Sequence, residues 1–119
     1  IFRYANVIIP QKTNNVVLDI ARYIKLNFNT NITLQSLSNI FGYTPNYLSS
    51  QFHKNMGKTI KQFLSDVRLE HAAKTLLTST ASVTDVCFAS GFTSLAHFLR
   101  VFKSKYKQSP GSYRKNINH

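Results

Sequence analysis

Two stretches of the chain are copies of one another, about fifty residues apart. The first runs from Gly42-Tyr43-Thr44 to Phe52-His53-Lys54, and the second runs from Gly91-Phe92-Thr93 to Phe102-Lys103-Ser104 with one extra residue. In each copy a short apolar segment precedes Gly-aromatic-Thr, and a segment with helical period follows it. A helix, a tight glycine turn and a second helix form a helix-turn-helix. The repeat therefore predicts two such units in one chain.

The charge balance predicts a polyanionic partner. Fifteen Lys and Arg against four acids give 119 residues a formal charge of +11, which attracts nucleic acid or an anionic surface at long range. With 43% apolar residues, the chain can fill one core or two small ones. No apolar run approaches the roughly 18 residues of a membrane span. The single cysteine, Cys87, fits a reducing cytoplasm. Because the chain starts at Ile1 without a signal segment, we expect a fragment of a longer protein.

Helical periodicity predicts an all-α fold of seven helices. Residues 1–14 are expected to be irregular, a linker or the remnant of an upstream domain, although Val7-Ile8-Ile9 also fits a strand. The first helix-turn-helix subdomain, with a long linking helix, is expected at 15–79 and the second at 80–119. The predicted helices are about 15–28, 34–41, 45–56, 59–77, 82–90, 94–105 and one from Ser109-Pro110 onward.

The ends of these helices carry local signals. Thr33 and Thr44 are predicted N-caps, and Pro45 suits the first helical position, where its missing N–H costs nothing. Thr59-Ile60-Lys61-Gln62 and Ser82-Val83-Thr84-Asp85 have the pattern of capping boxes.

The long helix at 59–77 is predicted to serve two cores. At about 100° per residue its apolar residues form two clusters on different faces, one in each half of the helix. About 20 residues at roughly 1.5 Å each span about 30 Å, close to one turn of B-DNA. The first cluster is Ile60, Phe63, Leu64 and Val67, and the second is Leu69, Ala72, Ala73, Leu76 and Leu77.

The order of these motifs resembles the AraC/XylS-type DNA-binding domain of bacterial transcription regulators, over about residues 15–117. The resemblance implies seven helices, with the third and sixth in successive major grooves of double-stranded DNA. It also implies activation through RNA polymerase, no cofactor, a bacterial cytoplasmic location at the nucleoid, and an effector or dimerisation domain before Ile1. The residues that carry it are Leu34, Leu37-Ser38, Gly42-Tyr43-Thr44-Pro45, Leu48, Phe52-His53-Lys54, Gly57-Lys58-Thr59, Arg68-Leu69, Ala72, Leu76-Leu77, Val83, Asp85-Val86, Gly91-Phe92, Phe98 to Lys103, Ser109-Pro110 and Tyr113-Arg114.

Carried over residue by residue, the resemblance assigns base-reading positions to two helices. Asn46, Ser49 and Ser50 are polar residues that can hydrogen-bond base edges, although small polar residues also occur on solvated helix faces. The matching positions of the second helix, Leu95, Ala96, Leu99 and Arg100, depart from the usual polar pattern. Apolar side chains there would pack on thymine methyl groups, or this helix mainly holds the backbone. Arg100 is a candidate for a hydrogen-bonded contact with a guanine base or with a phosphate.

The remaining polar residues sort by location. Arg68 is expected to be a structural partner of a carboxylate, and Lys107 stands where the family has glycine, which puts the turn before the last helix in doubt. A solvated basic surface is the alternative for any single lysine. The expected phosphate-backbone contacts are Thr33, Thr44, Lys54, Lys58, Lys61, Thr93, Lys103, Lys105, Lys107 and Ser109.

Catalytic and metal functions are not indicated. The four histidines and one cysteine lack the close spacing of a zinc site, and the four acids form no carboxylate pair. Cys87 is predicted to be a small core residue. We therefore expect no enzyme activity and no metal. The alternative function is a basic helical module that binds a protein or an anionic surface. A membrane helix would leave one apolar face without a partner, whereas each stripe here has a neighbour in a bundle, so no membrane partner is expected.

Overall fold

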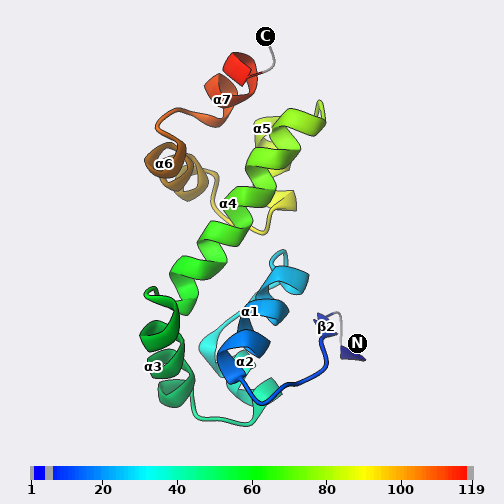
Figure 1. Cartoon of the computed structure of the whole chain (residues 1–119). Coiled ribbons are helices and arrows are strands. Elements are labelled where there is room, and N and C mark those ends of the chain that lie inside the picture. The colour runs from blue at the N-terminus through cyan, green and yellow to red at the C-terminus, as the bar shows by residue number, and fades with distance from the viewer. Residues whose placement is uncertain (1, 5–6, 118–119) are drawn as a thin grey trace. The chain divides into compact units, whose positions relative to one another are not determined.

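The computed structural model describes residues 2–4 and 7–117, and its helices follow the predicted order (Figure 1). The seven expected helices are present in this part of the chain, so the all-α class is confirmed, with two short strands added. The elements are β1 Phe2–Tyr4, β2 Val7–Ile9, α1 Val16–Asn27, α2 Leu34–Phe41, α3 Pro45–Met56, α4 Ile60–Thr78, α5 Val83–Ala89, α6 Leu95–Tyr106 and α7 Pro110–Ile117.

The expectation that residues 1–14 are irregular is wrong for β1, whereas β2 has the bounds of the strand considered as the alternative at Val7-Ile8-Ile9. β1 and β2 pair antiparallel, with Arg3 opposite Ile8; Ile1, Ala5 and Asn6 lie outside the described residues. The side chain of Asn27, at the end of α1, accepts a hydrogen bond from the Ile8 N–H at 2.6 Å and donates to the Ile8 carbonyl at 2.5 Å. The buried amide of Asn27 thus satisfies the backbone N–H and carbonyl of Ile8 in β2. The two residues are 19 apart in sequence, so no local pattern reveals this contact.

Most helix ends follow the local signals in the sequence. The hydroxyl of Thr44 accepts from the third backbone N–H of α3, and Pro45 occupies the first position. Thr59 and Gln62 form the reciprocal capping box, with N···O distances of 2.9 and 3.0 Å. Gly42 ends α2 in the left-handed conformation at φ 80°. Capping residues and a C-terminal glycine were therefore sufficient to place these boundaries.

The turn after α6 keeps the geometry that a glycine would give. Lys107 adopts φ 64° and donates its N–H to the Lys103 carbonyl at 2.8 Å. Among the described residues it is the one non-glycine with positive φ. An L-residue in this conformation carries steric strain of roughly 1 kcal/mol or more. The doubt about this turn is resolved in favour of the usual geometry, held by a strained lysine.

The chain divides into two compact units, residues 1–67 and 68–119, each with its own core. The division falls inside α4, whereas the expected boundary followed this helix at residue 79. Ile60 and Leu64 of α4 belong to the first core, and Leu69, Ala72 and Leu76 belong to the second. The two apolar faces predicted for this helix therefore contribute to two cores. The buried aromatics nearest the repeated motifs are Phe41 and Phe52 in the first unit and Phe92, Phe98 and Phe102 in the second.

Candidate nucleic-acid interface

In the first unit, α3 presents a polar face because its opposite face is anchored in the core. Leu48 and Phe52, four residues apart, are fully buried. The helical period then directs Asn46 and Ser50 outward, and both are exposed, while Ser49 is half-buried. The structure thus brings the three predicted reading residues of α3 onto one outer face, with Lys54 one turn further along and exposed.

In the second unit, α6 repeats this arrangement with different chemistry. Phe98 and Phe102 are fully buried, and Ala96, Leu99 and Arg100 are exposed. Leu99 keeps 38% of its surface exposed, so its methyl groups are accessible on this face. The predicted reading residue Leu95 is placed differently, since it is half-buried and packs against the second core.

The N-caps align the two helices residue by residue. Thr44 and Ser94 each accept a hydrogen bond, at 3.2 Å, from the backbone N–H three residues later. Counting from these caps, three outward positions of α3 correspond to three of α6. Their side chains are polar and short in α3, but mostly apolar with one cation in α6. The corresponding pairs are Asn46 with Ala96, Ser49 with Leu99, and Ser50 with Arg100.

Two features of the α3 surface were missed in the sequence. His53 is exposed and lies seven residues after Asn46, which places it on the same face, and helical spacing alone could have found it. Tyr43 and Tyr47 stack with ring centroids 5.0 Å apart and remain 46% and 43% exposed. The corresponding turn aromatic of the second unit, Phe92, is only 5% exposed, so the repeat gave no sign of this exposed pair.

On α6, Arg100 contacts a histidine on its own helix. Its Nη2 lies 2.7 Å from Nδ1 of His97, one turn earlier. The His97 ring in turn lies beside Phe92, with ring centroids 6.1 Å apart. The sequence analysis gave His97 no role, although the spacing of three residues between it and Arg100 was visible.

The capping hydroxyls predicted to contact phosphate are exposed. Thr33 and Thr44 accept hydrogen bonds from backbone N–H groups of α2 and α3. Thr93 is exposed just before the cap of α6, and Ser109 accepts a hydrogen bond from the Ser112 N–H at 3.2 Å. A hydroxyl oxygen that accepts a backbone hydrogen bond can still donate its own hydrogen to a phosphate oxygen.

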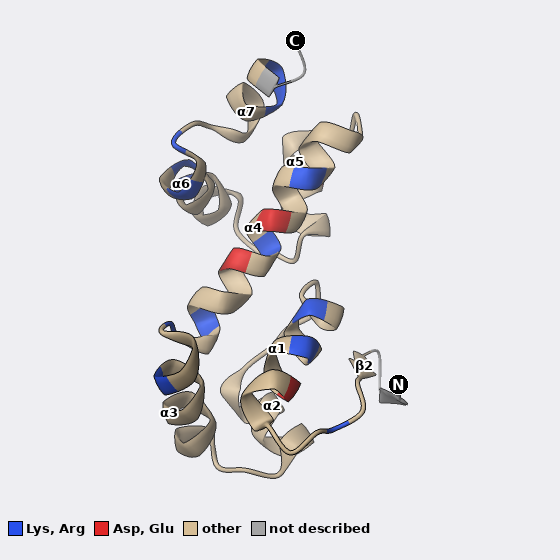
Figure 2. Ribbon diagram, viewed as in Figure 1, with Lys and Arg blue, Asp and Glu red and all other residues tan. Residues whose placement is uncertain are grey.

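Lys and Arg occur along α3, α4 and α6 (Figure 2). The six predicted lysines fall into two groups. Four form an exposed group on α3, α4, α6 and the turn after α6, whereas half-buried Lys58 and exposed Lys105 form ion pairs within their own unit. Lys58 lies 2.7 Å from a carboxylate oxygen of Asp66, and Lys105 lies 3.8 Å from one of Glu70. Partly exposed pairs of this kind contribute about 0–1 kcal/mol, so a phosphate can compete for the lysine. The exposed group is Lys54, Lys61, Lys103 and Lys107.

The acids do little to offset this positive surface. Asp19 is 3% exposed, and its carboxylate accepts hydrogen bonds from the Thr13 N–H at 3.0 and 3.1 Å. Asp66 and Glu70 face the lysines just described. Arg68 is half-buried, and burial lowers its pKa; its pairing with a carboxylate stays a prediction.

Other kinds of site find little support in the described residues. They contain no group of three or more His, Cys, Asp or Glu side chains that could hold a metal ion. Cys87 is fully buried, and burial raises the pKa of its thiol, as expected of a core residue. None of the helices that the structure describes combines the length and apolar content needed to cross a membrane.

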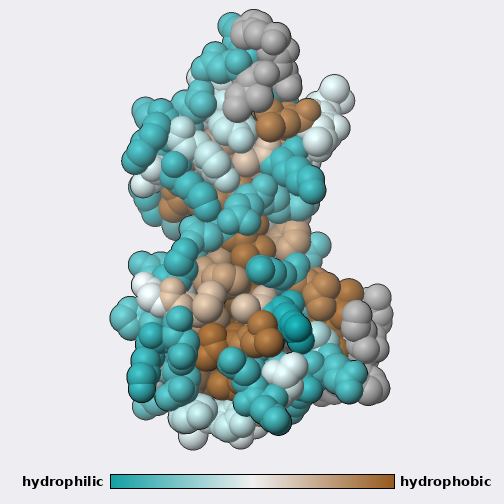
Figure 3. Space-filling model, in the orientation of Figure 1, coloured by the Kyte–Doolittle hydropathy of each residue, from teal (hydrophilic) through white to brown (hydrophobic). Residues whose placement is uncertain are grey.

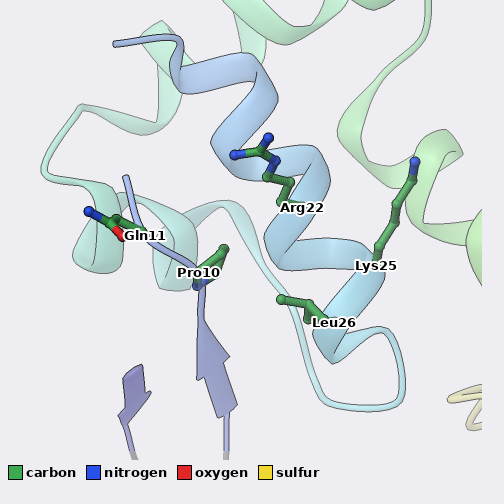
Figure 4. Close-up of a pocket in the computed structure, with 5 residues that line it drawn as sticks. All are labelled: Pro10, Gln11, Arg22, Lys25 and Leu26. Atoms are coloured by element: carbon green, nitrogen blue, oxygen red, sulfur yellow. The ribbon is translucent and has the colours of Figure 1, made fainter. Parts of the chain in front are cut away.

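Hydrophobic residues reach the surface on one side of the first unit (Figure 3). Leu18 and Leu26 of α1 are exposed by 41% and 42%. Beside α1 is a hollow of about 410 Å³, where the side chain of Leu26 lies near Pro10 (Figure 4). Arg22 and Lys25 also line it, but no residue of α3 does, so this hollow lies apart from the outer face of α3.

Comparisons with known proteins agree with this geometry. A family model of a helix-turn-helix domain matches residues 37–116. An uncharacterised HTH-type transcriptional regulator of Staphylococcus aureus is 35% identical over 98 residues, which are 82% of this chain and 13% of that protein. A probable AraC family transcriptional regulator from Rhodopseudomonas palustris has a solved structure with a TM-score of 0.80 and 26% identity, covering 87% of this chain and 97% of that one. The DNA-binding domain of the transcriptional factor AdpA, solved in complex with a target DNA, has a TM-score of 0.81 and 20% identity, covering 87% and 93%.

The chain belongs to the family of AraC-type helix-turn-helix domains, which are DNA-binding domains of bacterial transcription regulators and not a class of enzymes. It spans 13% of the length of the S. aureus regulator, so the activity of the protein that carries the domain is a separate question.

Proposed function

We propose that the chain binds double-stranded DNA in a sequence-specific way, with α3 and α6 inserted in successive major grooves. The observation that carries this proposal is the repeated helix. In both units a helix is anchored by two fully buried residues four positions apart and presents an exposed outer face. An α-helix fits the major groove, where each base pair has a distinct pattern of donors and acceptors. The formal charge of +11 supports a polyanionic partner.

The two helices would read different features. Asn46 of α3 can pair with N6 and N7 of adenine, and the hydroxyls of Ser49 and Ser50 can bond either kind of edge. On α6, Ala96 and Leu99 offer methyl groups to thymine, and Arg100 can donate two hydrogen bonds to O6 and N7 of guanine. We therefore expect one half-site to be recognised by polar contacts and the other mainly by thymine methyl groups and one guanine.

The phosphates would be held by the exposed lysines and the capping hydroxyls described above. The N-termini of α2 and α7 suit the same role, because backbone N–H groups without a partner in the helix point along the helix axis there. These contacts set affinity and orientation without distinguishing sequences.

We propose further that the domain serves a transcription activator that acts through RNA polymerase, in a longer protein with an effector or dimerisation domain. The resemblance and the relatives' names support this role. The alternative is a basic module that binds an acidic protein or anionic surface. The repeated anchored helix favours DNA binding over this alternative. A protein that binds anions in general needs positive charge, but it does not need two helices with matching outer faces.

A competition titration tests the proposal. Asn46→Ala should lower affinity for the cognate duplex by roughly 1–3 kcal/mol and leave affinity for a scrambled duplex nearly unchanged. Lys103→Ala is the matched control, and it should weaken both duplexes similarly because a phosphate contact carries no sequence information. If Asn46→Ala weakened the two duplexes equally, its role in base reading would be wrong. If the native chain did not prefer duplex DNA over an anionic vesicle, the basic-module alternative would be favoured.

A further inference from the structure

Arg100 is the one long, flexible side chain among the aligned reading positions of α3 and α6. Its counterpart in α3 is Ser50, whose hydroxyl lies one bond from Cβ and has few positions to choose from. An arginine has several side-chain torsions, and a free one must be ordered before it can pair with a base. The structure shows Arg100 already in contact with another group, since its Nη2 lies 2.7 Å from Nδ1 of His97.

The chemistry of this contact fixes the state of the histidine. A guanidinium carries donors only, so Nδ1 of His97 must accept the hydrogen bond. This contact corresponds to the tautomer of His97 with its hydrogen on Nε2. Only one of the five N–H groups of Arg100 is used in this way, which leaves a pair free for O6 and N7 of guanine.

His97 is itself held at two points. Its backbone N–H donates to the Ser94 hydroxyl at 3.2 Å, which fixes it in the first turn of α6. Its ring lies beside Phe92, with centroids 6.1 Å apart, and Phe92 is buried in the second core. The backbone of His97 is thus held by the capping residue, and its ring lies beside a core aromatic. The corresponding residue of α3, Tyr47, offers no ring acceptor and stacks on exposed Tyr43 instead.

We propose that His97 is a positioning residue for Arg100: it holds the guanidinium over the outer face of α6 in the orientation that pairs with guanine. This inference rests on the proposed function, because it requires Arg100 to read a base. It assigns to the second unit a pair, His97 and Arg100, that acts as one reading element. The short readers of α3 need no such partner.

Three variants separate the roles of the ring and of the acceptor. His97→Phe keeps an aromatic ring beside Phe92 but removes the acceptor, and His97→Gln removes the ring but keeps an acceptor oxygen three residues before Arg100. Arg100→Ala removes the reader itself. The measurement is the affinity ratio between the selected duplex and duplexes with the other base pairs at the guanine position. Because His97 and Arg100 are both exposed, thermal unfolding of each variant should match that of the native chain.

Arg100→Ala should abolish the preference for guanine, and His97→Phe should reduce it about three- to tenfold, the usual effect of losing pre-organisation in one long side chain. His97→Gln should retain most of it, and affinity for scrambled duplex should stay unchanged in both His97 variants. Full or increased preference in His97→Phe, with loss in Arg100→Ala, would overturn the positioning role and leave DNA reading by Arg100 intact. Retained preference in Arg100→Ala would overturn both.

Discussion

Lys107 shows how a single residue can depart from a family pattern without changing the fold. The position ends α6 in the left-handed conformation, where glycine carries no steric penalty and lysine does. The hydrogen bond from its N–H to the Lys103 carbonyl is nevertheless formed at 2.8 Å. The side chain is exposed and cationic. Its charge adds to the proposed phosphate contacts, while the strain in the backbone lowers the stability of the domain.

Lys107→Gly is therefore expected to stabilise the domain and weaken DNA binding. The unfolding free energy should rise by roughly 0.5–1 kcal/mol, the relief of αL strain less the greater entropy of glycine in the unfolded chain. Urea denaturation measures the first effect and duplex titration the second. Lys107→Ala is the matched control, because it removes the same charge but keeps the strain. Equal stability of the two variants would show that the strain at φ 64° does not exceed the entropy cost of glycine, which would contradict the prediction.

At the scale of single elements, local signals predicted the helices well. Caps such as Thr44 and the Thr59–Gln62 pair act within one turn, so the residues that decide a helix end are adjacent in sequence. The strand β2 was given only as an alternative, because the side chain of Asn27 binds it from the far end of α1 and no local pattern shows this contact. The exposed Tyr43–Tyr47 stack and the His97–Arg100 contact depend on which rings the cores leave uncovered, which periodicity does not specify.

The contact between α4 and α5 gives a prediction on pH. Nδ1 of His71 lies 2.9 Å from the hydroxyl of Ser90, which is fully buried. Burial, and then the charge of Lys74, lower the pKa of His71 below its ordinary 6.5. Between this lowered pKa and 6.5 the unfolded chain binds a proton that the folded chain does not. His71 therefore makes the unfolding free energy fall as pH falls through that window, and it has no such effect above it.

His71→Gln should remove this dependence, because glutamine does not titrate. The measurement is urea denaturation of both proteins across the window, with the difference in unfolding free energy plotted against pH. The native chain should lose stability relative to the variant as pH falls. All other residues are the same in the two proteins, so their contributions cancel in the difference. A difference independent of pH would contradict the assigned shift.

For the whole molecule, the repeat and the charge have separate consequences. The repeat gives each unit its own core and its own outward helix, with α4 contributing to both cores. The charge of +11 is independent of any particular helix and governs attraction to the duplex as a whole. Specificity and salt dependence should therefore respond to different substitutions.

Duplex binding should be strongly salt-dependent. If roughly six phosphates are neutralised, the slope of log K against log salt should be near −5, from about −0.9 per phosphate. Lys103→Ala should make this slope shallower by about one. Lys74→Ala removes one exposed charge from α4, outside the proposed contacts, and should leave the slope unchanged. Equal slopes in the two variants would mean that overall charge, and not particular lysines, sets the binding.

Selection of bound duplexes from a random library tests the central claim most directly, that α3 and α6 each read one half-site. The selection is run with the native chain, Asn46→Ala and Arg100→Ala. The native chain should select two half-sites with centres about 10 base pairs apart, one helical turn. Asn46→Ala should relax one position in one half-site, and Arg100→Ala should relax one position in the other. A single selected motif, or two variants that relax the same half-site, would contradict reading by two helices.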